Sequence, residues 1–177
     1  MLLFVILLTL TLQPALSKKG QTALSKSGLS QPQPKPQRCV NAVDPEKHYT
    51  FLKHHLNNNV PKSDDIKEWH KFITKIKTWH RPVQSFFLYS ESEYDKVLAV
   101  CSTEGKIFPS KNLCISKKTF NFYNVTVNSK MRVKKVKFIT NRHVILGCEK
   151  TLNKCLPIHF EANEYAIPDD NQPDCSG

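Results

Sequence analysis

The chain has 177 residues, with 26 Lys or Arg, 15 Asp or Glu, six cysteines and a formal net charge of +11. Its length suits a single domain with a modest core. No pair among the cysteines has the CxxC or CxxxxC spacing of zinc ligands, so composition argues against a structural zinc site and favours three disulfide bonds.

The amino-terminal segment predicts export. Residues 2–12 are almost wholly apolar, a run too short to cross a bilayer, and small residues follow at Ala15-Leu16-Ser17. We therefore expect a signal peptide at 1–17 and an extracellular protein; a membrane anchor is the alternative. Residues 18–43 are rich in Pro, Gln, Ser and Lys, which predicts a flexible basic arm, whose end Cys39 could tether.

Helical signals come first in the remaining chain. Asp44, Pro45 and Glu46 can start a helix that runs to Leu56. Ser63, Asp64 and Asp65 can cap a second helix, with an apolar stripe formed by Ile66, Trp69, Phe72, Ile73 and Ile76. A strand is expected over 83–89 and a third short helix over 93–101.

Strand signals follow. The runs 119–127, 133–140, 143–148 and 156–160 are rich in β-formers and are separated by Asn, Ser, Lys and Gly. Helices early and antiparallel strands late predict an α+β fold, with short helices in the amino-terminal half packed on a curved antiparallel β-sheet.

Charge is unevenly distributed along the second half of the chain. Between Lys106 and Cys148 there is no Asp or Glu, but there are ten cations: Lys106, Lys111, Lys117, Lys118, Lys130, Arg132, Lys134, Lys135, Lys137 and Arg142. Such a field suits phosphate polymers or anionic surfaces. A merely solvated face is the alternative. Residues 161–177 carry five acids and no cation, and this tail could fold over a basic cleft.

Two histidines near opposite ends of the chain and a central arginine form the candidate catalytic set. His55 follows Phe51 by four residues, Arg81 opens the run Arg81-Pro82-Val83-Gln84-Ser85-Phe86, and His159 lies in Pro157-Ile158-His159-Phe160-Glu161. Two histidines and a cation can supply a general base, a general acid and an electrostatic clamp for phosphoryl transfer. With Ala99-Val100-Cys101 and His143–Glu149, these motifs resemble the pancreatic-type (ribonuclease A) family over residues 44–165, leaving 166–177 as an acidic tail.

The resemblance implies a role for each motif residue. It makes His55 the base, His159 the acid and Arg81, in place of the family's lysine, the clamp on the phosphate. The substrate-binding set would be His54, Ser85, Phe160 and Glu161. In the family, the position of His54 contacts the phosphate and that of Ser85 reads a pyrimidine edge. The position of Phe160 contacts the phosphate through its backbone amide, and an aspartate at the position of Glu161 orients the acid histidine. The resemblance implies no metal and no cofactor.

The cysteines match the family only in part. The resemblance implies a Cys101–Cys148 bridge and apolar packing in place of two others, with Ile66 facing the Tyr123 region and His80 facing Val133. The remaining Cys39, Cys114, Cys155 and Cys175 allow three pairings, and one of these, Cys155 with Cys175, would hold the tail near His159. Asn124-Val125-Thr126 is a sequon for glycosylation.

Two functions are therefore expected as alternatives. The first is a secreted monomeric ribonuclease that cleaves single-stranded RNA after pyrimidines through a 2′,3′-cyclic phosphate, weakened by the altered central motif. The second is an inactive cationic protein of the same fold that binds nucleic acid, glycosaminoglycan, or cell or microbial surfaces in host defence or reproduction.

Overall fold

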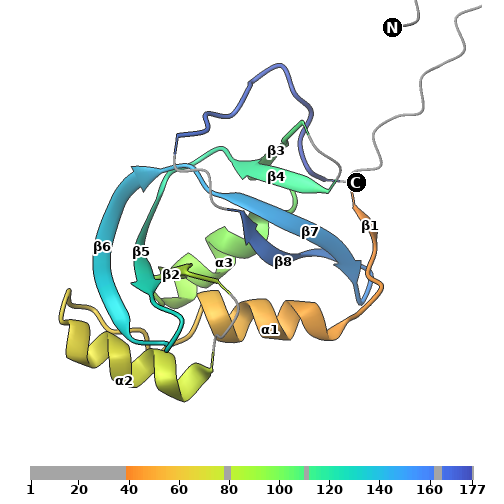
Figure 1. The fold of residues 1–177 in the computed structure, drawn as a ribbon. Helices are drawn as coiled ribbons and strands as arrows, with labels where there is room; N and C mark the ends of the chain where they lie inside the picture. Colours follow the sequence, from red (N-terminus) through yellow and green to blue (C-terminus); the bar gives the residue numbers. More distant parts are fainter. Residues whose placement is uncertain (1–38, 78–80, 110–111, 162–164, 177) are drawn as a thin grey trace, which may run out of the picture. The chain divides into compact units, whose positions relative to one another are not determined.

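The computed structural model describes residues 39–77, 81–109, 112–161 and 165–176 (Figure 1). The described residues all belong to one compact unit. The expected signal peptide and most of the expected arm lie outside the described residues, as does His80. Among the described residues, no helix is both apolar and long enough to span a membrane.

Each of the three helices begins beside a polar side chain that accepts a hydrogen bond from an amide of its first turn. Helix α1 spans Glu46–His55, and the Asp44 carboxylate accepts a hydrogen bond from the Glu46 amide at 3.0 Å. Helix α2 spans Ile66–Ile76, and Asp65 caps it by accepting from the Lys67 amide at 2.7 Å. Helix α3 spans Glu91–Ala99 and starts two residues earlier than expected, because Ser90 accepts a bond from the Glu93 amide.

The strands form two sheets. The first contains β1 (Val40–Asn41), β3 (Gly105–Ile107), β4 (Leu113–Ser116), β7 (Ile145–Thr151) and β8 (Lys154–Glu161), arranged around β7. The second contains β2 (Val83–Phe87), β5 (Phe120–Val127) and β6 (Val133–Arg142), in the order β2-β5-β6 (Figure 1). The structure thus confirms the α+β expectation, and it adds β1, β3 and β4, which the sequence did not indicate.

Helix α2 covers one face of the second sheet. Trp69 is fully buried, and its ring lies 5.2 Å from that of Phe86 and 5.1 Å from that of Tyr123. Ile66, which was expected to pack towards the Tyr123 region, is 47% exposed at the start of the helix. The ring contact with Tyr123 comes from Trp69, which lies about one turn further along the same side of the helix.

A second core joins α1, α3 and both sheets. The ring of Phe160 on β8 lies 5.4 Å from Phe87 on β2 and 5.5 Å from Phe122 on β5. Phe51 of α1 belongs to the same cluster. This core fixes the end of α1 and the end of β8 against β2, the place where the candidate catalytic residues meet.

All six cysteines are paired. Cys101 bonds to Cys148, as the resemblance implied, and the other bridges are Cys39–Cys155 and Cys114–Cys175. The alternative pairing of Cys155 with Cys175 is therefore not formed. Strand β1 pairs in parallel with β7, so residues 39–41 of the expected flexible arm are tied into the sheet, with Cys39 as the tether.

The acidic tail is anchored on β3 and β4. The Ile107 amide donates to the Pro173 carbonyl and the Cys175 amide donates to the Gly105 carbonyl. Asp174 lies 3.2 Å from the Lys106 ammonium and 2.9 Å from that of Lys117, and these bonds lower the pKa of its carboxyl group. The tail thus neutralises part of the basic region at this edge of the sheet, where it runs beside β3 and β4 (Figure 1).

Candidate active site

His55 is the last residue of α1, and its ring is held by a hydrogen bond to β2. Its Nδ1 lies 2.7 Å from the Ser85 carbonyl oxygen on β2, so Nδ1–H donates to that carbonyl and Nε2 keeps the basic lone pair. Its ring packs between those of Phe51, at 5.0 Å, and Phe160, at 5.7 Å. Burial lowers the pKa of His55 from 6.5 to about 4, against the opposing effect of the bond to Ser85. The imidazole is therefore neutral at pH 7.

His159 lies near the end of β8, and its tautomer is set by Glu161. Glu161 Oε2 is 3.0 Å from His159 Nε2, two residues further along the same strand and hence on the same face. Nε2–H therefore donates to the carboxylate, which leaves Nδ1 as the atom that can exchange a proton with a substrate. The glutamate side chain is one methylene longer than the aspartate expected from the resemblance, and it still makes this bond.

Arg81, just before β2, packs against the ring of His159. Its Nη2 is 3.1 Å from Nδ1 and 3.3 Å from Nε2, and Nη1 donates to the Phe160 carbonyl at 3.3 Å. A single nitrogen at nearly equal distance from both ring nitrogens cannot lie along either in-plane lone pair, so the guanidinium lies against the ring. A cation therefore lies beside Nδ1 of His159.

The three candidate catalytic residues come together although they are 26 and 78 residues apart. The charges of His159, Arg81 and neighbouring His54 each lower the pKa of His55, which places all of them within electrostatic reach of its ring. His54 itself is partly buried, with its ring 6.5 Å from that of His55. The arrangement offers a neutral imidazole, a carboxylate-oriented imidazole and a guanidinium around one place.

Ser85 and Phe160 are more buried than their expected roles suggest. The Ser85 hydroxyl donates to Asn124 Oδ1 at 2.7 Å, and Ser85 is only 7% exposed. Its proton is thus committed to a neighbour, and only its oxygen lone pairs are left for a base. Phe160 is 6% exposed and its ring belongs to the core.

Sequence reasoning missed the role of Asn124. The asparagine was noted only as a glycosylation site, whereas its side chain accepts the Ser85 hydroxyl from the opposite strand, where the two residues are paired in register. Knowledge of the β2–β5 register would have been needed to find it. Glycosylation at Asn124 stays a prediction, now for a partly buried position in the central strand of the second sheet.

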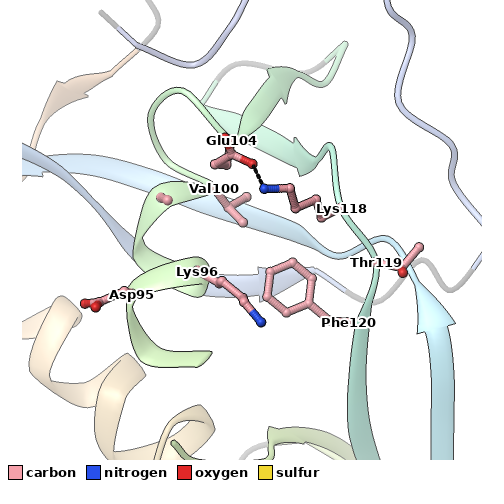
Figure 2. Close-up of a pocket in the computed structure, with 8 residues that line it drawn as sticks. Asp95, Lys96, Val100, Glu104, Lys118, Thr119 and Phe120 are labelled. Carbon is pink, nitrogen blue, oxygen red and sulfur yellow. Dashed lines mark ion pairs between the residues drawn. The ribbon is translucent and has the colours of Figure 1, made fainter. Parts of the chain in front are cut away.

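No metal centre emerges from the described part of the chain, where no group of three or more His, Cys, Asp or Glu is placed to hold an ion. A pocket of about 300 Å³ lies between α3 and the start of β5 (Figure 2). Val100 and Phe120 form its apolar wall, and the Lys118–Glu104 ion pair, at 3.0 Å, stands at its rim. The candidate catalytic residues do not line it.

Comparison with known proteins supports the fold. Neither a scan against protein-family models nor a search of curated proteins finds a match. Among solved structures, 165 chains match, including the X-ray structure of zebrafish RNase5, with a TM-score of 0.50 and 18% sequence identity over 69% of this chain and 100% of that chain. A structural match at so low a sequence identity supports the fold alone. The chain has an α+β fold of the ribonuclease A type.

Proposed function

We propose that this protein is a secreted ribonuclease of reduced activity, which cleaves single-stranded RNA after pyrimidines without a metal ion. The observation that carries the proposal is the convergence of His55, His159 and Arg81 on one place, in a fold of the ribonuclease A type. The three disulfide bonds support an extracellular location, since such bonds persist in oxidising compartments.

In this proposal each group has one step. His55 Nε2 takes the proton from a ribose 2′-hydroxyl, whose oxygen then attacks the neighbouring phosphorus. The bond from phosphorus to the 5′-oxygen breaks, and His159 Nδ1–H protonates that oxygen as it leaves. Arg81 stabilises the negative charge that builds up on the phosphoryl oxygens. In the second step water opens the 2′,3′-cyclic phosphate, with His159 as base and His55 as acid.

Three features of the site reduce its expected rate. A base with a pKa of about 4 has little driving force to take a proton at pH 7. Arg81 contacts both nitrogens of His159, so a substrate must displace it from the ring. The Ser85 hydroxyl is already bonded to Asn124. A combined loss of several kcal/mol, about a thousandfold in rate, follows from such changes.

Cleavage of a uridylyl-adenosine dinucleotide in EDTA tests the proposal. The wild type should release adenosine and uridine 2′,3′-cyclic phosphate, and His55→Ala and His159→Ala should each abolish this release. His70→Ala, an exposed histidine on α2, is the matched control and should retain it. An intact dinucleotide at high protein concentration, or equal release by all four proteins, would contradict the proposal.

The second candidate, an inactive cationic protein that binds polyanions, is favoured by one observation. Lys134, Lys135 and Lys137 are all exposed on β6, in a stretch of chain without acids. Binding of heparin and RNA with equal strength and a steep salt dependence, unchanged in His55→Ala, together with no cleavage, would favour this candidate over the enzyme.

A further inference from the structure

The pocket between α3 and the start of β5 has an apolar floor that the core holds in place (Figure 2). Val100 and Phe120 form this floor, and both are buried in the core that contains Phe160. The ring of Phe120 also packs against that of Phe87 on β2, with 5.5 Å between the ring centres. The floor therefore has a fixed position that does not depend on an occupant.

Covalent and hydrogen bonds fix the two walls of the pocket. The bridge between Cys101 and Cys148 ties the chain just after α3 to β7. The Glu104 amide donates to the Ala99 carbonyl at 3.1 Å, and the Lys117 amide donates to the Glu104 carbonyl at 2.9 Å. These bonds join the turn after α3 to the segment before β5. A pocket whose walls are already fixed loses little conformational entropy when a ligand enters.

Two lysines flank the mouth of the pocket. Figure 2 shows Lys96 on α3 and Lys118 before β5, with the apolar floor between them. Lys118 pairs with Glu104 at 3.0 Å, and Lys96 pairs with Glu93 at 3.6 Å. The two lysine side chains are 73% and 58% exposed, and ion pairs at such exposure are weak. Either ammonium group can therefore turn from its partner towards another carboxylate.

The charges around the mouth favour an anionic ligand. Asp95 lines the pocket, but its carboxylate points away from Val100 and Phe120 in Figure 2. The carboxylate of Glu104 is already paired with Lys118. The whole chain carries a formal charge of +11, which attracts anions from solution.

The size of the pocket limits the ligand to a small molecule. Its volume is about 300 Å³, at the lower end of the range for ligand sites. A cavity of about 150 Å³ is enough to hold benzene, so this pocket has room for roughly two fused rings.

We propose that this pocket binds a small aromatic carboxylate, with its rings against Val100 and Phe120 and its carboxylate on Lys96 and Lys118. The aliphatic stems of the two lysines cover the rings from the solvent side, while their ammonium groups meet the carboxylate. The site is separate from the candidate catalytic residues, which do not line the pocket.

Lysine stems also cover apolar surface in proteins that bind nothing there, so the same side chains have a purely structural explanation. The two explanations differ in what they expect of charge. A pocket that only shields the core does not distinguish a carboxylate from a neutral molecule of the same shape.

Titration of the full chain with naphthoate, followed by the amide NMR signals of the pocket residues, tests the inference. Naphthamide has the same rings without the charge, and naphthylmethylammonium carries the opposite charge. The double variant Lys96→Gln and Lys118→Gln is compared with Lys71→Gln and Lys75→Gln, which removes two exposed lysines of α2. No residue of α2 lines the pocket, and both double variants lose the same charge.

We expect the wild type to bind naphthoate with a Kd of about 1 mM or below. Naphthoate should bind about fivefold more tightly than naphthamide, the effect of one good exposed ion pair. The variant without Lys96 and Lys118 should lose this preference, and the α2 variant should keep it. Ala99→Leu, which places a larger side chain in the pocket, should remove the binding of both probes.

Equal affinity for naphthoate and naphthamide, or an unchanged preference in the variant without Lys96 and Lys118, would overturn the inference. Tighter binding of naphthylmethylammonium would also overturn it and would assign the charged contact to Glu104. These comparisons stand even if Ala99→Leu does not fold, because the exchanged lysines are exposed. All of the outcomes are distinct from a failure of the proposed function, since no probe is a substrate for cleavage.

Discussion

Burial of His55 should make the stability of the protein sensitive to acid, and His55→Asn should remove that sensitivity. The asparagine amide can still donate to the Ser85 carbonyl, but it does not titrate. The pKa of His55 is lowered from 6.5 to about 4, so as the pH falls through this window the unfolded chain binds a proton that the folded chain does not. The part of the unfolding free energy that depends on neutral His55 is fully present above pH 6.5 and is lost as the pH falls towards 4. The difference between a pKa of 6.5 and one of about 4 corresponds to about 3 kcal/mol.

Urea unfolding at pH 7, 6, 5 and 4, with the disulfides intact, measures this difference. The variant will be less stable than the wild type at pH 7, because the ring contacts with Phe51 and Phe160 are lost. Between pH 7 and 4 the variant should nevertheless lose about 3 kcal/mol less unfolding free energy than the wild type. The histidine NMR signal that disappears in the variant should titrate near pH 4 in the wild type. Equal losses in both proteins, or a titration of that signal near 6.5, would show that burial does not lower the pKa of His55.

Three further changes have defined outcomes. Arg81→Ala should lower kcat/KM for uridylyl-adenosine by about 100- to 1000-fold, since it removes the cation beside His159. An unchanged kcat/KM would mean that another residue stabilises the charge of the transition state. Glu161→Ala should lower kcat by roughly ten- to a hundredfold with little effect on KM, because His159 loses its orienting partner, and a change in KM alone would contradict that role. Cys39→Ser with Cys155→Ser should lower the unfolding free energy by about 2 to 5 kcal/mol and leave turnover at 25 °C within twofold, whereas lost turnover in a folded variant would mean that β1 supports the site.

Long periodic elements of this fold could be predicted from the sequence, and short ones could not. Helix α2 has a full apolar stripe and a capping aspartate, and β5 has eight residues of β-forming character. Strands β1, β3 and β4 have two to four residues, too few to show a period. The pairing of Cys39 with Cys155 could not be deduced either, because β1 must first add to the edge of β7.

The residues of the candidate site could be predicted from the sequence, but the contacts between them could not. His55, Arg81 and His159 were found from the order of the motifs that flank them. The bond from Ser85 to Asn124 depends on a register between strands 39 residues apart, and the contact of Arg81 with the ring of His159 depends on the meeting of β2 and β8. The low pKa of His55 follows from burial between two phenylalanines, one of them more than a hundred residues away. No local pattern carries this information.

A change of leaving group separates the proposed roles of His55 as base and His159 as acid. A uridine 3′-nitrophenyl phosphate expels a stable phenolate that needs no proton, whereas uridylyl-adenosine expels an alkoxide that does. We expect His159→Ala to abolish cleavage of the dinucleotide but to lower cleavage of the nitrophenyl ester less than tenfold, and His55→Ala to abolish both. Equal losses on both substrates in His159→Ala would contradict the assignment of His159 as the acid.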